Sequence, residues 1–336
     1  MQNHYIITAD SVDDLMHKTF KTLRKEGENV SASRGAKKTI REIIDAKLVL
    51  KNPLARLSIS ESRSTPFSAF GEFLWYYSGR RDLEFIEYYI RRYKNWSDDG
   101  ETIYDAYGPR IKGEDDFPNQ LMNIINLLKR RRNSKKAVIQ IYSGEDLDKH
   151  INLSVKNIPC TLGFQFLIRD DELTMIVNMR SNDVIWGLPH DLFSFTMFQE
   201  IVAREVGCEL GEYVHNVGSL HYYTDTGIEE RINDYLHEGY QDSESCIMPK
   251  MPEAALSQLD KIIIIEDDFR QGNEVNIAKY KLNDYWKDVA ILLQCYSLKK
   301  MDKNQKLLAE AKKFTHKIYK DYTDKLTLNI RNEIKK

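Results

Sequence analysis

An apolar hairpin followed by an apolar helix is the feature that most constrains how this chain can fold. The segment TLGFQFLIRDDELTMIVNMR, residues 161–180, predicts two strands joined by an Arg-Asp-Asp-Glu turn. The segment HDLFSFTMFQEIVAREVG, residues 190–207, predicts a helix that is apolar on most of its faces and ends at Gly207. Because a helix of this kind must be buried, we expect it to pack in the core.

The rest of the chain alternates between predicted helices, strands and polar turns, with no internal repeat and no clear linker. The signals predict helices in residues 10–27, 65–93 (broken near Ser78-Gly79), 284–298 and 304–322, a helix, basic turn and strand in 117–142, strands in 212–223 and 261–269, a small-residue basic turn in 30–43, and a polar loop ending in a Tyr-Gly-Pro turn in 95–111. The pattern predicts a single continuous fold of the α+β class.

Composition limits the kinds of ligand that the chain can attract. The 336 residues are 42% hydrophobic and 30% charged, with a formal net charge of -2. This balance provides no field for steering toward nucleic acid or an anionic membrane, so an anionic ligand needs a local cluster of donors. The chain has no apolar run long enough to span a bilayer and no signal-peptide core, and we expect a cytoplasmic protein.

Cysteine placement points to one candidate nucleophile. Cys208, Cys246 and Cys295 are expected to be small buried hydrophobes, and no CxxC spacing suggests a metal site. Cys160 differs because it follows a proline at the start of the predicted hairpin, and Arg180 lies at the end of the partner strand. Pairing of the two strands would bring a positive charge to the thiol, which is what a reactive thiolate needs. Ordinary packing of both residues is the alternative.

Several motifs, in order along the chain, extend this interpretation. They are Arg34-Gly35, Glu72 and Trp75 in GEFLWYY, Tyr107-Gly108, Pro159-Cys160, the run Arg180, Ser181, Asp183, Gly187, Leu188 and Pro189, and Gly218, His221 and Tyr223. Together they resemble the thymidylate synthase superfamily over residues 30 to 225. The resemblance implies a mixed sheet with flanking helices, a pyrimidine nucleotide substrate, and methylenetetrahydrofolate as the one-carbon donor, with no metal.

The resemblance also implies a role for each candidate residue. Residues 1–250 would form the catalytic domain, and residues 251–336 a strand and helices that complete or extend it. Homodimers would form across the sheet faces and share active sites. The expected catalytic residues are Cys160 as the nucleophile, Arg180 as its partner, Glu72 as a proton relay through water, Tyr107 and Asp191. The expected phosphate and sugar ligands are Arg34, Arg180, Ser181, the partner-contributed pair Lys135 and Lys136, His221 and Tyr223, and the expected folate contacts are Trp75, Asp183, Trp186 and Gly187.

Some of these roles have structural alternatives. Trp75 and Trp186 fit core packing as well as they fit cofactor contact, and Tyr107 and Ser181 are often structural. The basic run KRRRNSKK is typical of a solvated turn, and Lys135 and Lys136 stand where the family has an Arg-Arg phosphate clamp. A lysine ammonium is a point charge and cannot form a bidentate fork to phosphate.

Asp191 is the position that bears on the base. Thymidylate synthases that act on dUMP have Asn there, because an amide accepts from N3–H of uracil and donates to O4. A carboxylate would set oxygen against O4, whereas it accepts well from the amino group of cytosine, and a proton added to N3 during attack by Cys160 would be stabilised beside it. Asp191 therefore indicates a cytosine base. A helix cap is its structural alternative.

A second departure concerns the product. Thr161 follows the nucleophile where thymidylate synthases generally have His, and the wording Val177 to Val184 and Asn216 to His221 resembles phage deoxycytidylate hydroxymethylases. The C-terminal NIRNEIKK also differs from the apolar tail that closes a synthase site, which would favour entry of water. We expect hydroxymethylation of a cytidine monophosphate, dCMP in preference to CMP. Two alternatives remain: a thymidylate synthase acting on dUMP, and a non-catalytic nucleotide-binding protein.

Overall fold

The predicted hairpin forms the middle of the central sheet. The structure is a computed structural model that describes residues 5–32, 39–60, 66–114, 118–240, 243–320 and 322. In it, β5 (Thr161–Arg169) and β6 (Glu172–Asp183) pair antiparallel, with Thr161 opposite Met179. The turn between them places Asp170 and Asp171 at φ 47° and 64°, the left-handed region that Asp tolerates better than most residues. The hairpin prediction is confirmed.

The other strands extend this hairpin into a mixed sheet. They are β1 (Tyr5–Ala9), β2 (Glu28–Ser31), β3 (Thr39–Leu50), β4 (Val138–Gln140) and β7 (Glu209–Tyr223). Within the described residues the seven strands form one sheet in the order β1-β3-β7-β6-β5-β4, with β2 paired to β3. The β6–β7 and β1–β3 pairs are parallel, and the others are antiparallel. The long connection between β6 and β7 carries a helix, as a parallel pair requires.

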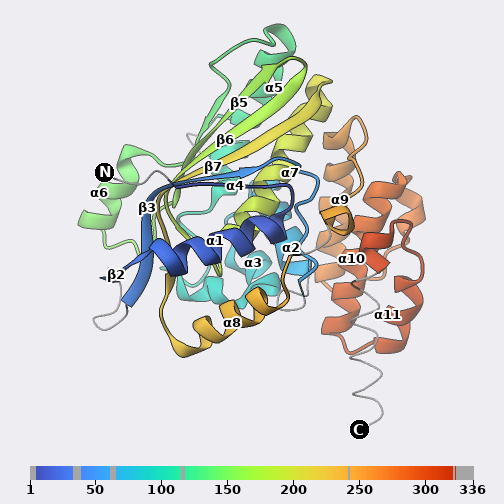
Figure 1. Cartoon of the computed structure of the whole chain (residues 1–336). Coiled ribbons are helices and arrows are strands. Elements are labelled where there is room, and N and C mark those ends of the chain that lie inside the picture. The colour runs from blue at the N-terminus through green and yellow to red at the C-terminus, as the bar shows by residue number, and fades with distance from the viewer. Residues whose placement is uncertain are drawn as a thin grey trace.

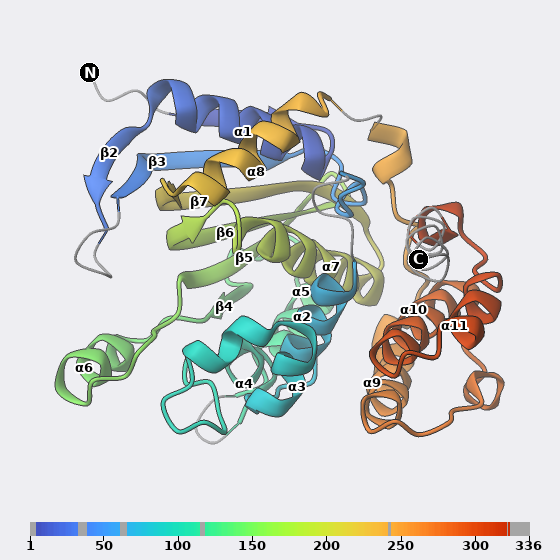
Figure 2. The ribbon, with the colours of Figure 1, turned by 90° about the horizontal axis from the view of Figure 1, so that it is seen from below.

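Helix α7 (Leu188–Val206) is that crossover helix, and it lies at the centre of the molecule against β6 and β7 (Figures 1 and 2). It ends at Gly207, whose φ of 74° suits a residue without a Cβ. Its buried aromatic side chains pack against α2 (Phe67–Tyr77) through edge-on contacts, with ring centroids 4.8 Å apart for Phe70–Phe193 and 5.5 Å for Phe73–Phe198. The predicted buried helix is confirmed.

The remaining helices flank this core. They are α1 (Val12–Glu26), α3 (Leu83–Tyr89), α4 (Tyr107–Lys112), α5 (Gln120–Arg130), α6 (Gly144–Asn152), α8 (Thr226–His237), α9 (Ala255–Arg270), α10 (Asp284–Lys300) and α11 (Asn304–Ala311). The C-terminal helices α9 to α11 gather at one end of the molecule, where α9 contacts α7 and α10 contacts α2 (Figure 2). The expected α+β class, with a mixed sheet, flanking helices and a helical C-terminal region, is confirmed.

Four local predictions are wrong. In the described part of residues 30–43, residues 30–31 belong to β2 and residues 39–43 to β3 rather than to a basic turn. Residues 261–269 form part of helix α9 rather than a strand, because Leu259, Ile262, Ile265 and Phe269 recur at helical spacing on one buried face. The Tyr-Gly-Pro turn is instead the first turn of α4, a position where proline costs no helical hydrogen bond. The helix expected over residues 304–322 is interrupted, because α11 ends at Ala311 and a second helical segment covers residues 317–320.

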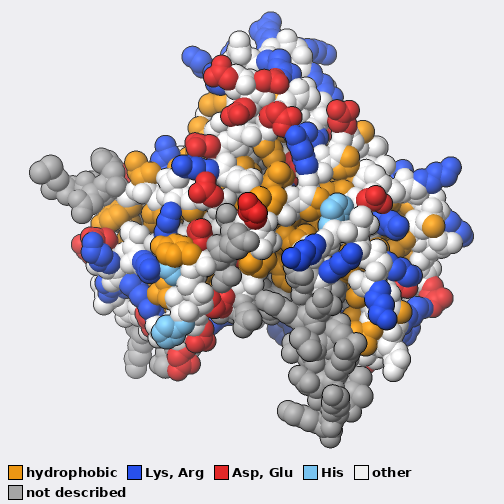
Figure 3. Space-filling view, turned by 45° about the vertical axis from the view of Figure 1, so that its right-hand side comes forward, with side chains coloured by type: hydrophobic (Ala, Val, Ile, Leu, Met, Phe, Trp, Pro, Cys, Tyr) orange, Lys and Arg blue, Asp and Glu red, His pale blue; other side chains and the backbone are white. Residues whose placement is uncertain are grey.

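The surface agrees with the nearly balanced charge. The face in Figure 3 carries Lys and Arg side chains interspersed with Asp and Glu side chains, and no broad area of a single sign is visible there. None of the helices in the described residues has the length and apolarity that crossing a bilayer would demand.

Candidate active site

The candidate nucleophile meets its predicted cation. Cys160 immediately precedes β5, and its backbone carbonyl accepts from the Arg180 amide at 2.8 Å. The Arg180 guanidinium donates to the Cys160 Sγ at 3.5 Å and to the carbonyls of Ile158 and Pro159, both at 2.9 Å. These bonds fix the guanidinium over the thiol, where its positive charge stabilises a thiolate. The half-buried sulfur remains accessible to a ligand.

Tyr107 lies beneath this pair. Its hydroxyl accepts from the Thr161 amide at 3.3 Å, and its ring stacks on Tyr76 with centroids 5.0 Å apart. Burial, together with the charges of Cys160 and Asp191, raises its pKa well above the usual range. Tyr107 therefore keeps its proton and can donate it in a hydrogen bond at the floor of the site.

Glu72 approaches from α2 and is held by two residues that the sequence did not single out. Its side chain is 5% exposed and accepts a short hydrogen bond from the Tyr93 hydroxyl. His190 Nδ1 lies 3.9 Å from the other carboxylate oxygen, and His190 Nε2 lies 3.0 Å from the Ser68 hydroxyl. Glu72 is thus fixed at the edge of the site with the His190 imidazole beside it, an arrangement suited to moving protons.

Asp191 points its carboxyl across the sheet rather than along its own helix. Helix α7 has Gly187 at its cap and no side-chain cap, and Asp191 Oδ2 accepts instead from the Asn182 amide at 2.7 Å. The interpretation of Asp191 as a helix cap is therefore wrong. The side chain is 7% exposed, and Tyr76, Tyr107 and Tyr213 lie close enough to interact with its charge.

This environment keeps a proton on Asp191. Burial is the largest cause, and the nearby charge of Glu72 adds to it, so that the pKa of Asp191 rises to about 8 despite the hydrogen bond from Asn182. Near neutral pH the group is mostly a carboxylic acid, with one O–H donor and one acceptor oxygen. A planar base with an adjacent donor and acceptor is its natural complement.

Asn182 is in turn held from β7. Its Oδ1 lies 3.1 Å from His215 Nε2, and His215 Nδ1 lies 2.8 Å from the Tyr213 hydroxyl. Both β7 residues are fully buried, and burial lowers the pKa of His215 to about 3. His215 is therefore neutral, and the group of four side chains is a buried polar network inside an apolar core.

The residues expected to contact the cofactor divide into two groups. Asp183 Oδ1 accepts from the amides of Ile185 and Trp186 at 2.7 and 2.9 Å, and burial raises its pKa. Trp186 is 36% exposed, and the guanidinium carbons of Arg92 and Arg231 lie 3.8 and 4.5 Å from its ring centroid. Gly187 follows directly, so these three residues form one side of the site.

Trp75 lies elsewhere. It is fully buried on α2, with its ring edge-on to Tyr93 at 5.3 Å between centroids. A ring with no exposed surface offers no platform to a ligand, so the structure favours the core interpretation of Trp75.

The expected sugar ligands lie on the strands that meet at Asp183. In the β6–β7 register, Ser181 stands opposite Ser219 and Asp183 opposite His221. His221 Nδ1 lies 3.3 Å from the Ser219 carbonyl, and its ring is edge-on to Tyr223 at 5.8 Å. The register therefore places Ser181, His221 and Tyr223 along one end of the sheet, the end that also holds Arg180.

The comparison of the whole chain with known families matches it to the thymidylate synthase model over residues 17–292. The chain belongs to the thymidylate synthase family. Its mixed sheet and helices agree with that fold. The family uses methylenetetrahydrofolate as the co-substrate for one-carbon transfer to a pyrimidine nucleotide.

Individual relatives of this thymidylate synthase family member carry two kinds of name. Deoxyuridylate hydroxymethyltransferase of Bacillus phage SP01 is 32% identical over 304 residues, covering 86% of this chain and 76% of the relative. The protein of the same name from Delftia phage PhiW-14 is 26% identical over 309 residues, covering 85% and 82%. A thymidylate synthase of Listeria monocytogenes is 28% identical over 204 residues, covering 60% of this chain and 52% of the relative.

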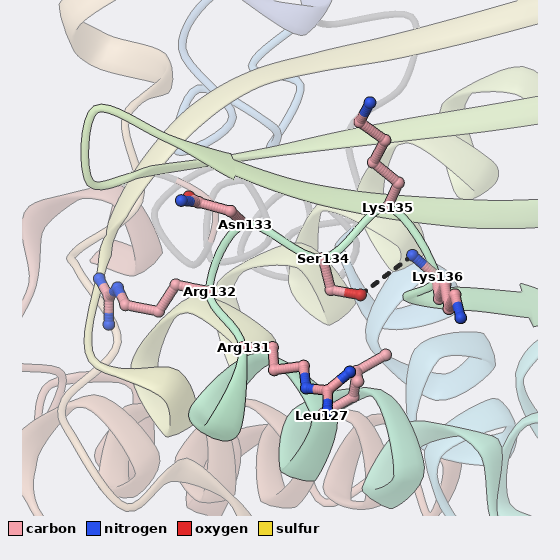
Figure 4. A pocket seen from close by; sticks show the side chains of 7 residues that line it. All are labelled: Leu127, Arg131, Arg132, Asn133, Ser134, Lys135 and Lys136. Carbon is pink, nitrogen blue, oxygen red and sulfur yellow. Dashed lines mark hydrogen bonds between the residues drawn. The ribbon is translucent and has the colours of Figure 1, made fainter.

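Two expected phosphate ligands of this family member lie away from Cys160 in the same chain. Lys135 and Lys136 line a shallow hollow of about 560 Å³ with residues 131–134 and Leu127, and Figure 4 shows the two ammonium groups pointing away from each other. The carbonyl of Lys135 accepts from Gln165 Nε2, and Gln165 stands five residues after Cys160, which is about 16 Å along an extended strand. Arg34 lies outside the described residues.

The site also contains residues that sequence reasoning did not identify: Tyr93, His190, Asn182, His215 and Tyr213. Asn182 was visible within the motif Arg-Ser-Asn-Asp, and Tyr213 and His215 share a strand face at a spacing of two. Their meeting depends on the pairing of β6 with β7 in the folded sheet, which local sequence does not show. Among the described residues, no group of three His, Cys, Asp or Glu side chains is placed to hold a metal ion.

Proposed function

We propose that this chain transfers a one-carbon unit from methylenetetrahydrofolate to C5 of a cytidine monophosphate and releases the 5-hydroxymethyl product, with dCMP preferred to CMP. The observation that carries the proposal is the buried carboxyl of Asp191 in the first turn of α7, which accepts from the neutral Asn182 amide and whose pKa burial raises to about 8. The remaining residues supply the thiolate, the proton transfers and the binding contacts that such a reaction needs.

Base recognition follows from the single proton on Asp191. Cytosine presents an acceptor at N3 and a donor at its C4 amino group, and a carboxylic acid offers the matching donor and acceptor. When the Cys160 sulfur bonds to C6, electron density moves to N3, which takes the proton from Asp191. The resulting carboxylate then faces two donors, the base and Asn182. The contact is stronger in the reacting state than in the ground state, which is the requirement for catalysis.

The other groups complete the chemistry. Arg180 stabilises the Cys160 thiolate before attack, and the adduct makes C5 a nucleophile. The bound folate supplies the one-carbon unit, because no side chain carries an activated methylene. Glu72, fixed by Tyr93 and close to His190, is placed to take the proton from C5 through water.

Two observations support a hydroxymethyl rather than a methyl product. Thr161 replaces the family's His after the nucleophile, and it is fully buried, with its hydroxyl 2.9 Å from Met179 Sδ. The relatives from Bacillus phage SP01 and Delftia phage PhiW-14 are named hydroxymethyltransferases. In this reaction water adds to the exocyclic carbon and the folate is not oxidised.

Nucleotide binding is proposed to involve two copies of the chain. Arg180, Ser181 and Arg34 would bind the phosphate together with Lys135 and Lys136 of a second copy, and His221 and Tyr223 would bind the 3′-hydroxyl. Strands β1, β3 and β4 expose apolar side chains, with Ile6 at 65%, Ile44 at 56% and Val138 at 48%. Such side chains on a sheet face fit burial against a second copy.

Transfer of the same hydroxymethyl group to dUMP is a second candidate. The names of the phage relatives favour it, and a neutral carboxyl could donate to O4 of uracil while accepting from N3–H. Cytosine is preferred because its N3 is a far stronger base than a carbonyl oxygen, and proton transfer from Asp191 therefore assists attack more. Ionised Asp191 would also oppose O4 directly.

Product identification tests the proposal. The purified protein is incubated with methylenetetrahydrofolate and equal amounts of dCMP, CMP and dUMP, and the products are resolved by mass spectrometry. We expect 5-hydroxymethyl-dCMP without formation of dihydrofolate. Hydroxymethyl-dUMP as the main product would support the second candidate, methylated dUMP with dihydrofolate would indicate a thymidylate synthase, and nucleotide binding without any product would indicate a binding protein.

A further inference from the structure

A chain of three hydrogen bonds runs from β7 to the carboxyl of Asp191. It links the Tyr213 hydroxyl to His215 Nδ1 at 2.8 Å, His215 Nε2 to Asn182 Oδ1 at 3.1 Å, and Asn182 Nδ2 to Asp191 Oδ2 at 2.7 Å. All four side chains are less than 9% exposed. Polar groups buried in this way are costly unless each is paired, so the chain has a defined arrangement.

The number of available protons determines which group donates in each of these hydrogen bonds. Neutral His215 has one ring N–H, and Tyr213 keeps its proton because burial raises its pKa well above the usual range. Since the Asn182 amide donates to Asp191, its oxygen must accept, and the proton of His215 therefore lies on Nε2. The Tyr213 hydroxyl then donates to Nδ1. Every donor in the chain points toward Asp191.

We propose that Asn182, held by His215 and Tyr213, is a positioning residue that donates to Oδ2 of Asp191 and so keeps Oδ2 as the acceptor and Oδ1, with its proton, as the donor toward the base. The proposal rests on the proposed function, because it assigns the specificity of the same carboxyl. Without these hydrogen bonds, the Asp191 carboxyl could rotate and the Asn182 amide could turn over. Asp191 would then present donor and acceptor in either order and would lose its preference between cytosine and uracil.

The start of α7 is shaped to admit this amide. A Cβ added at Gly187 would lie 2.9 Å from Asn182 Nδ2, 3.3 Å from the Asp183 carbonyl oxygen and 3.5 Å from Asp191 Oδ2, so the Asn182 amide would have to shift to make room for it. The glycine has φ of -87°, which every residue can adopt. Space for Asn182, rather than backbone conformation, therefore explains why this position is glycine.

Other charged and titratable groups also act on Asp191, and their effects on its pKa must be distinguished from the effect of the Asn182 hydrogen bond. Glu72 raises the pKa of Asp191 and the bond from Asn182 lowers it. The groups that interact with Asp191 are Glu72 and Tyr76 from α2, Tyr107 from α4, Asn182 from β6, and Tyr213 with its neighbour His215 from β7. Removing the Asn182 donor leaves Glu72 unopposed, so the pKa of Asp191 should rise further.

The experiment compares three variants, one for each residue that links β7 to Asp191 by hydrogen bonds. Asn182→Leu keeps the size of the side chain and removes both polar atoms, His215→Phe removes the support of the Asn182 oxygen, and Tyr213→Phe removes one hydroxyl that touches neither Asp191 nor substrate. For each variant, kcat/KM is measured with dCMP and with dUMP across the neutral and alkaline pH range. Tyr235→Phe is the matched control, because its buried hydroxyl bonds to Asp13 at 2.6 Å, away from the site.

We expect the dCMP-to-dUMP ratio of kcat/KM to fall about tenfold in Asn182→Leu, the fold-change worth one hydrogen bond, and by less in His215→Phe and Tyr213→Phe. The alkaline limb of the pH profile should move upward in Asn182→Leu, and Tyr235→Phe should match the wild type. An unchanged ratio and profile in Asn182→Leu would overturn the proposal, since a merely structural role would lower both activities equally.

If Asn182→Leu does not fold, Tyr213→Phe provides the test, because it keeps the aromatic ring and removes only the hydroxyl. An unchanged dCMP-to-dUMP ratio of kcat/KM in Tyr213→Phe would also contradict the role of the hydrogen bonds. The wild-type preference between dCMP and dUMP tests the proposed function separately from the positioning role. A wild-type preference for dUMP would refute the cytosine assignment, whereas the positioning role is judged by whether the ratio changes, whichever base is preferred.

Discussion

Two buried carboxyl groups in different parts of the molecule have opposite surroundings. Asp146, in the first turn of α6, accepts two hydrogen bonds from Arg110 at 2.6 and 2.7 Å, one from Tyr104 at 2.9 Å and one from the Ser143 amide at 2.7 Å. Asp191, in the first turn of α7, accepts one side-chain bond, from a neutral amide. Both residues lie in the first turn of a helix, but only Asp146 is paired with a positive charge, that of Arg110.

The pKa values follow this difference. Burial raises the pKa of Asp146, but the bonds from Arg110 and Ser143 outweigh it and hold the pKa below its usual value. Burial raises the pKa of Asp191 to about 8, and Glu72 raises it too. A carboxyl that keeps its charge serves the fold, whereas one that keeps a proton and a free oxygen is available to a ligand.

Replacing each carboxyl should therefore damage a different property. Asp191→Ala is expected to lower kcat/KM for the cytidine nucleotide by roughly 10²- to 10⁴-fold, the range of a general acid, because N3 loses its proton donor. The melting temperature should fall by less than in Asp146→Ala, since no buried charge loses its partner and only the Asn182 amide loses an acceptor. Steady-state kinetics and calorimetry on the same preparation check both points, and near-normal turnover would show that Asp191 does not act on the base.

Asp146→Ala should show the reverse. Arg110 would keep a buried charge without its partner, which costs about 3–5 kcal/mol of unfolding free energy. Urea unfolding of the variant and of the double variant Asp146→Ala with Arg110→Met measures this. The double variant should recover part of the loss, and a loss below about 1 kcal/mol in the single variant would mean that the pair is not balanced as the structure shows.

The two carboxyls should also give pH dependences of opposite sign. Native Asp191 binds its proton up to about pH 8, while the unfolded group releases it near 3.8, so stability falls as pH rises through that window. The slope is at most about 1.4 kcal/mol per pH unit. The contribution of Asp146 is fully present above its unfolded pKa of 3.8 and is lost as pH falls through the lower native value.

Unfolding free energies across this pH range, for the wild type and Asp191→Asn, test the sign. The variant should gain on the wild type as pH rises from about 4 to about 8. If the difference in unfolding free energy between the two proteins did not change with pH, Asp191 would not be the group that holds the proton.

Sequence reasoning succeeded where chemistry depends on neighbours along one hairpin. The pairing of Cys160 with Arg180 followed from two strands and a turn, and the buried helix α7 followed from its apolar faces. It failed where a run of isoleucines hid a helical period at residues 261–269. It could not foresee the bond between Asn182 and His215, 33 residues apart, because the two side chains meet only in the folded sheet, where β6 pairs with β7 and Asn182 stands opposite Leu220 rather than His215.

Base choice by Asp191 is the central claim, and the ratio of kcat/KM for dCMP over dUMP in the wild type and in Asp191→Asn tests it most directly. An amide cannot transfer a proton to N3 of cytosine, whereas it can donate to O4 and accept from N3–H of uracil, so the substitution removes the assistance to attack on cytosine and keeps a matching pair for uracil. We predict that the wild type prefers dCMP and that Asp191→Asn prefers dUMP. The same preference in both proteins would contradict the claim.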